Sequence, residues 1–106
     1  RDYATAVGTK VYQAPEVFEQ QKMTAESDVF AVGEVIFELL SGRHPFESRT
    51  EQGMIENICK GEIAPFPAYT EGSMKQIVMA MMNHNPSRRP SAKEVLSHDV
   101  VRMYLR

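Results

Sequence analysis

The stretch of sequence that says most about this chain is Gly8-Thr9-Lys10-Val11-Tyr12-Gln13-Ala14-Pro15-Glu16. Three further stretches follow it in order. Twelve residues after Glu16 comes Asp28-Val29-Phe30-Ala31-Val32-Gly33, and the apolar run that it opens ends at Ser41-Gly42-Arg43-His44-Pro45-Phe46. Far downstream lies Asn85-Pro86-Ser87-Arg88-Arg89-Pro90. Ala-Pro-Glu alone occurs often by chance, so the information lies in the order and spacing of all four stretches.

This order resembles the second half of the C-terminal lobe of a eukaryotic Ser/Thr protein kinase, over essentially the whole chain. In that family Ala-Pro-Glu closes the activation loop. The resemblance implies that residues 1–106 are a partial kinase domain of an α+β two-lobed parent. Residues 1–16 would be the activation loop with its Ala-Pro-Glu segment, and residues 17–106 a helical subdomain. The chain contains no Gly-rich loop, Val-Ala-Ile-Lys strand, His-Arg-Asp loop or Asp-Phe-Gly motif.

Composition excludes several classes of partner. The net charge is −2, which gives no reason to expect nucleic acid or an anionic membrane. No apolar stretch approaches the roughly 20 residues that span a bilayer. The single cysteine, Cys59, fits a reducing compartment, and we expect an intracellular, cytoplasmic protein. The three histidines lack metal-ligand spacing, so we expect no metal site in this chain.

Periodicity predicts an all-α chain with a long N-terminal loop and four main helices. Apolar residues cover nearly every face of Asp28–Leu40, which is typical of a buried helix, and Gly42 suits its C-terminal cap. The other expected helices are a short one at Pro15–Glu19, one bearing Met54, Ile55 and Ile58 that ends at Gly61, one bearing Met74, Ile77, Val78 and Met81, and a last one through Val95 and Leu96 that opens with a capping box of Ser91 and Glu94.

The resemblance assigns roles to the N-terminal residues. Gly8, Thr9 and Tyr12 would help form the pocket that receives the peptide substrate, and the Gly-Thr pair favours the Ser/Thr branch. Thr5 lies four residues before Thr9, where many members carry an activating phosphothreonine. A phosphate there would add about −1.5 to −2 charges and order the loop through Arg partners. Without the resemblance, these residues read as an ordinary loop.

Two further roles are structural. The resemblance implies that Glu16 and Arg89 meet as an ion pair across 73 residues of sequence. A guanidinium can bind a carboxylate through two parallel hydrogen bonds. Asp28 would fix the catalytic loop of the intact enzyme, besides favouring the positive end of a helix dipole. The sequence departs from the family at Lys10, often Pro; at Phe30-Ala31, usually Trp-Ser; and at His98-Asp99, usually His-Pro.

The intact parent would transfer the γ-phosphate of ATP to a Ser or Thr hydroxyl of a protein substrate. This chain would supply the peptide platform and the helical base beneath the catalytic loop. ATP and Mg²⁺ would be bound by residues outside this chain, in the upstream half of the kinase domain, so we expect the chain alone to be inactive. Two alternatives stay open: a pseudokinase scaffold, and an unrelated helical protein-interaction module with chance motifs.

Overall fold

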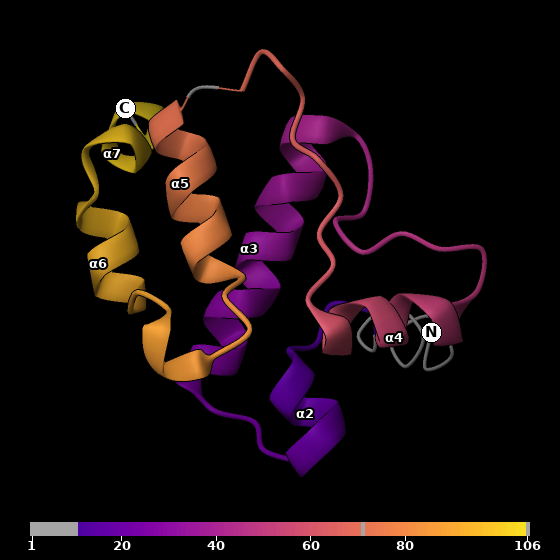
Figure 1. Ribbon diagram of the computed structural model, residues 1–106. Coiled ribbons are helices and arrows are strands. Elements are labelled where there is room, and N and C mark those ends of the chain that lie inside the picture. The colour runs from indigo at the N-terminus through magenta and orange to yellow at the C-terminus, as the bar shows by residue number, and fades with distance from the viewer. Residues whose placement is uncertain (1–10, 71, 106) are drawn as a thin grey trace, which may run out of the picture.

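The computed structural model describes residues 11–70 and 72–105. These residues form helices joined by loops and contain no strand, which confirms the all-α prediction for this chain (Figure 1). The elements are α2 (Pro15–Gln20), α3 (Ala25–Ser41), α4 (Glu51–Lys60), α5 (Gly72–Met81), the 3₁₀ helix η1 (Pro86–Arg88), α6 (Ala92–Ser97) and α7 (Asp99–Leu105).

Helix α3 runs through the middle of the molecule, with α5 along one side and α4 on the other (Figure 1). It begins at Ala25, three residues before the predicted Asp28. The reason is a capping box at Thr24, whose hydroxyl accepts from the Ser27 N–H while the Ser27 hydroxyl accepts from the Thr24 N–H. It ends as predicted at Gly42, where φ is 78°, a left-handed conformation that favours glycine.

Helices α3 and α5 pack closely because α3 carries a glycine at the contact. A Cβ atom added to Gly33 would lie 2.9 Å from Met81 Cβ and 3.0 Å from Met82 Cγ. Both methionines are buried, as is Met74, which lies on the same face of α5 about two turns before Met81. Met74 and Met81 of α5 therefore fill the core, as expected from their spacing.

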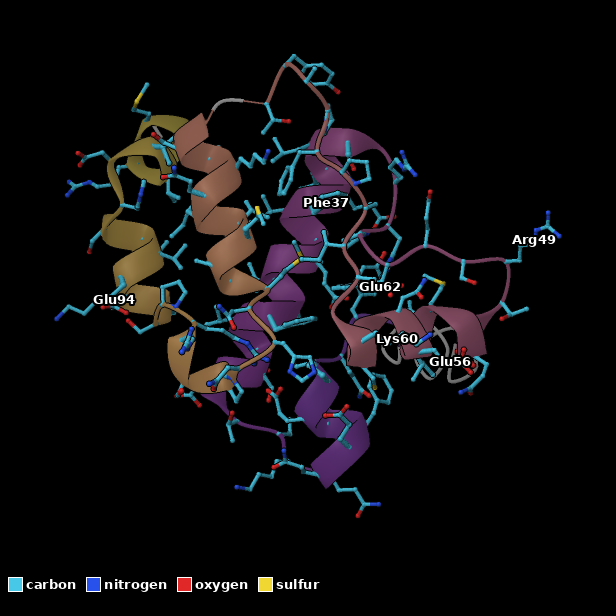
Figure 2. The ribbon with its side chains drawn as sticks, in the orientation of Figure 1. Phe37, Arg49, Glu56, Lys60, Glu62 and Glu94 are labelled. Carbon is cyan, nitrogen blue, oxygen red and sulfur yellow. The ribbon has the colours of Figure 1, made fainter. Side chains whose placement is uncertain are left out.

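The core is rich in aromatic rings on the opposite side of α3. Phe30 stacks on Phe46 with ring centroids 5.8 Å apart, and Phe37 meets the edge of Phe66 at 4.6 Å. Figure 2 shows Phe37 in the interior, facing the chain that follows α4. Full burial of such a side chain contributes roughly 1.5–3 kcal/mol. These rings hold α3 against the loops that precede and follow α4.

The short helix α2 begins with Pro15 at its first position, as predicted, and packs against α4. Helix α4 is capped by Thr50 at its start and by Gly61, with φ 77°, at its end. Charged residues on and around α4, such as Arg49, Glu56 and Lys60, project outward (Figure 2). This leaves Ile58 as the fully buried residue of α4.

The C-terminal region differs from the prediction in one respect. The predicted capping box is present, with Ser91 Oγ accepting from the Glu94 N–H at 3.0 Å and Glu94 Oε1 accepting from the Ser91 N–H at 2.7 Å. The predicted helix through Val95 and Leu96 is present as α6, but it is not the last one, because the backbone at His98 is extended and a further helix, α7, follows. His98 Nδ1 accepts from the Val100 N–H and so caps the second piece.

Candidate functional site: the anchored N-terminal segment

Glu16 and Arg89 form a bidentate ion pair. Arg89 Nη1 donates to Glu16 Oε2 at 2.7 Å and Nη2 donates to Glu16 Oε1 at 2.8 Å. Both side chains are almost wholly buried, at 0% exposure for Arg89 and 5% for Glu16. Helix α2 positions the carboxylate and the segment after η1 positions the guanidinium. The structure thus brings together the two residues that the family resemblance paired across 73 positions.

Arg89 uses all five of its N–H groups. Besides the two bonds to Glu16, it donates to three backbone carbonyls, those of Asn83 at 2.7 Å, Glu26 at 2.9 Å and His84 at 3.3 Å. Its guanidinium also lies 4.8 Å from the centre of the Phe30 ring, a cation–π contact. One side chain therefore joins α2, the first turn of α3 and the loop between α5 and η1.

The Glu16 carboxylate is held in its charged form. Burial alone would raise its pKa, but hydrogen bonds from Arg89 and from Ser27 Oγ, at 2.8 Å, outweigh burial and lower the pKa of Glu16. Ser27 thus serves twice, in the cap of α3 and as a second donor to Glu16. We call the cluster of Glu16, Ser27 and Arg89 the carboxylate lock.

A second attachment lies just before the lock. The Tyr12 hydroxyl donates to Glu38 Oε1, on the last turns of α3. Burial, and then the hydrogen bond and negative charge of Glu38, raise the pKa of Tyr12 to about 12, so the phenol stays neutral and donates. The Tyr12 ring also contacts the ring of His44, with centroids 5.0 Å apart. Tyr12 is thereby fixed on α3.

A buried carboxyl lies beneath this attachment. Glu34 is fully buried, and neither of its oxygens has a hydrogen-bond partner among the residues that the structure describes. Its nearest cationic candidate, His44 Nε2, is 4.0 Å away, too far for a hydrogen bond. Burial raises the pKa of Glu34 to about 10, against a smaller lowering by the charge of Arg89. Glu34 is therefore a neutral acid at pH 7.

The other side of α3 carries an exposed apolar stripe. Val32, Val35 and Leu39 are 50%, 44% and 80% exposed, so the described residues of this chain do not cover every face of the apolar helix α3. Two apolar grooves of about 300 and 380 Å³ flank the stripe. One is lined by Ala25, Asp28, Val29, Val32, Met81, Ala92, Val95 and Leu96, and the other by Ile36, Leu39, Leu40, Met74, Ile77, Val78, Met81 and Val101.

Asp28 lies at the start of this stripe and is exposed. It is in the first turn of α3, where its charge complements the helix dipole, although the cap itself is formed by Thr24. Arg88, the neighbour of Arg89, is exposed. The predicted Thr5, Gly8 and Thr9 lie outside the described residues. Of the predicted substrate pocket, the structure therefore describes only Tyr12.

Sequence reasoning missed four members of this site: Ser27, Glu34, Glu38 and His44. The signal for Glu34 and Glu38 was present, because a carboxylate within an otherwise apolar helix requires an explanation. Ser27 and His44 form hydrogen bonds, to Glu16 and to backbone groups respectively, that no sequence motif predicts. Among residues 11–70 and 72–105 there is no group of three His, Cys, Asp or Glu residues placed to hold a metal ion. None of the described helices is long and apolar enough to cross a membrane.

Comparison with known proteins agrees with this geometry. The family model for the protein kinase domain matches residues 1–101. The chain is 33% identical over 106 residues to the G2-specific protein kinase nimA of Emericella nidulans, covering 99% of the chain and 15% of that protein. It is 37% identical over 92 residues to the mouse serine/threonine-protein kinase Nek3, covering 87% of the chain and 18% of the relative.

A plant relative extends the range of similarity. Calcium-dependent protein kinase 33 of Arabidopsis thaliana is 39% identical over 106 residues, covering 96% of the chain and 20% of that protein. The chain thus spans a fifth or less of the length of each of these three relatives. Because the match to the protein kinase domain covers residues 1–101, this chain belongs to the protein kinase family.

Proposed function

We propose that this chain is part of a Ser/Thr protein kinase that transfers the γ-phosphate of ATP to serine or threonine hydroxyls of proteins. The observation that carries the proposal is the anchoring of the segment Val11–Glu16, by Tyr12 on Glu38 and by Glu16 on Arg89. A peptide platform must hold its shape while a substrate binds, because reaction rates depend steeply on the position of the reacting groups. Gly8, Thr9 and Tyr12 form the pocket in this proposal.

The described residues do not fit a site for Mg²⁺-ATP. They contain no cluster of metal-ligating side chains, and their lysines, Lys22, Lys60, Lys75 and Lys93, are all exposed. Phosphoryl transfer in kinases requires residues that hold metal ions, a lysine on the phosphates and an aspartate that orients the hydroxyl. We propose that the upstream half of the kinase domain supplies them and that this chain supplies no step of the chemistry.

The exposed stripe on α3 supports the proposal that this chain packs against an upstream half of the kinase domain. Apolar surface that lines two grooves usually marks a missing partner. In the proposal, the upstream half of the kinase domain covers Val32, Val35 and Leu39, and Asp28 at the start of the stripe accepts hydrogen bonds from the backbone of the catalytic loop. The exposure of Asp28 leaves its carboxylate accessible for that role.

The test is transfer of radiolabelled phosphate from ATP to a generic Ser/Thr protein substrate. Residues 1–106 and the full-length protein that contains them are assayed side by side. We expect transfer by the full-length protein and none by the fragment. Transfer by the fragment would contradict the assignment of roles. No transfer by a folded full-length protein, phosphorylated at Thr5, would favour the scaffold alternative.

A further inference from the structure

His44, in the loop after α3, uses both of its ring nitrogens on the backbone. Nδ1 accepts from the Phe46 N–H at 3.0 Å, and Nε2 lies 2.7 Å from the carbonyl oxygen of Val11. A nitrogen that accepts an N–H carries no proton itself, so the proton of the neutral ring is on Nε2 and is donated to Val11. The side chain is 8% exposed. His44 is therefore a fixed bridge between its own loop and the segment Val11–Gln13.

That segment has few other attachments. Between described residues, the hydrogen bonds of Val11–Gln13 are the bond from His44 to Val11 and the bond from Tyr12 to Glu38. The second of these is backed by the contact between the Tyr12 and His44 rings. Removing His44 would therefore weaken both attachments, one directly and one through the lost ring contact.

Burial keeps the ring of His44 neutral. Burial lowers the pKa of His44, against a raising by the Val11 carbonyl and by the carboxylates of Glu38 and Glu47. Glu34 also faces the ring, but its oxygen is 4.0 Å from Nε2 and its carboxyl is neutral. The Nε2–H is consequently committed to Val11.

We propose that His44 is a positioning residue for the peptide platform, which it fixes by donating its Nε2–H to the Val11 carbonyl. The inference rests on the proposed function, since it takes Val11–Gln13 as part of the surface that meets the substrate. It assigns to His44 a role in substrate binding that is separate from the chemistry. One net hydrogen bond corresponds to about a 2- to 10-fold change in an equilibrium.

Three substitutions in the full-length protein separate the contributions of the ring. His44→Gln places an amide N–H near the position of Nε2 and keeps the donor to Val11. His44→Asn keeps an acceptor near Nδ1 for the Phe46 N–H but does not reach Val11. His44→Phe keeps the ring contact with Tyr12 and removes both hydrogen bonds. His98→Phe is the matched control, because His98 Nδ1 also accepts an N–H two residues ahead, that of Val100.

The first measurement is steady-state kinetics with a peptide substrate. We expect His44→Asn and His44→Phe to raise the KM for the peptide about 2- to 10-fold, with the KM for ATP unchanged. His44→Gln should raise this KM less than the other two His44 variants, because it keeps the donor to Val11 but loses the ring contact with Tyr12. His98→Phe should match the unmodified protein. An equal rise for Gln, Asn and Phe, or a parallel rise in the KM for ATP, would overturn the proposal. So would an unchanged KM for the peptide in all three variants.

The second measurement does not depend on activity. Hydrogen exchange of the full-length protein reports how firmly Val11–Gln13 is held. We expect faster exchange of these amides in His44→Asn and His44→Phe, a smaller increase in His44→Gln, and unchanged exchange in His98→Phe. Unchanged exchange in His44→Phe would overturn the proposal even if the kinase assay is positive. Absence of phosphate transfer by the unmodified protein, with faster exchange in His44→Phe, would instead reject the proposed function and retain the anchor.

Discussion

The guanidinium of Arg89 binds the carboxylate of Glu16 through two parallel hydrogen bonds of 2.7 and 2.8 Å, and both groups are buried. Breaking a buried pair by removing one partner leaves an uncompensated charge. We expect Glu16→Ala or Arg89→Ala to destabilise the kinase domain by about 3–5 kcal/mol. Urea unfolding of the full-length protein measures this loss. The exposed neighbour provides a control, since Arg88→Ala should change stability by less than about 0.5 kcal/mol.

The same pair predicts sensitivity to acid. The pKa of Glu16 is lowered in the folded state, so the folded protein binds its proton less readily than the unfolded chain. The stability from this group is present above the unfolded pKa, about 4.5, and is lost as the pH falls through the folded pKa. Unfolding curves measured from pH 6 down to pH 3 should show this loss. In Glu16→Gln, the free energy of unfolding should fall less steeply between pH 6 and pH 3. An equally steep fall in that variant would contradict the prediction.

Glu34 predicts the opposite dependence on pH. The pKa of Glu34 is about 10 in the folded state and near 4.5 in the unfolded chain. Between these two pH values the folded protein keeps a proton on Glu34 that the unfolded chain releases. Stability from this group is fully present below about 4.5 and declines as the pH rises toward 10, by at most about 1.4 kcal/mol per pH unit. Glu34→Leu should raise stability at pH 8 and remove the decline. Chemical denaturation at pH 6 and pH 9 tests this, with Glu34→Gln as the isosteric control.

Gly33 marks the close approach of α3 and α5. A methyl group there would meet Met81 Cβ at 2.9 Å and Met82 Cγ at 3.0 Å. We expect Gly33→Ala to lower the free energy of unfolding by about 1–3 kcal/mol because the core is overpacked. Gly72→Ala is the control, because a methyl group at Gly72 meets nothing within 4 Å. If the two substitutions change the free energy of unfolding equally, α3 and α5 can move apart at Gly33 without loss of stability, and the prediction is wrong.

The exposed stripe predicts the behaviour of the isolated chain. With Val32, Val35 and Leu39 uncovered, residues 1–106 alone should self-associate or unfold without cooperativity. Sedimentation and thermal unfolding measure both properties. Leu39→Lys should reduce self-association, whereas Tyr69→Ser should not, because Tyr69, though 79% exposed, does not line either groove. A cooperative transition from a clean monomer would show that the chain is self-sufficient.

Much of this structure follows from the sequence because its determinants are local or repeat a family pattern. The capping box at Ser91 and the end of α3 at Gly42 depend on residues adjacent in sequence, and both were predicted correctly. The pairing of Glu16 with Arg89 came from the resemblance, since no local rule joins residues 73 positions apart. The start of α3 was missed because its cap uses Ser27 where the common pattern has Glu or Gln.

The remaining misses have a common physical cause. The carbonyl oxygen of Val11, which His44 holds, is a backbone group present at every residue, so its use leaves no trace in the side-chain pattern. Likewise the division between α6 and α7 at His98 involves neither Gly nor Pro. The apolar stripe on α3 reads as core from sequence alone, because periodicity reports which surface must be covered but not which polypeptide covers it.

The span of sequence between Glu16 and Arg89 has a consequence for biosynthesis. Translation produces Glu16 first and Arg89 73 residues later, so the turn at Ala14–Glu16 cannot close on its partner until most of this chain has been made. A nascent or truncated chain that ends before Arg89 has Glu16 without its cation and α2 without its tie to the loop after α5. Such a chain exposes surface to proteases and chaperones. Whether Glu16 is retained in its folded position thus depends on a residue made 73 positions later.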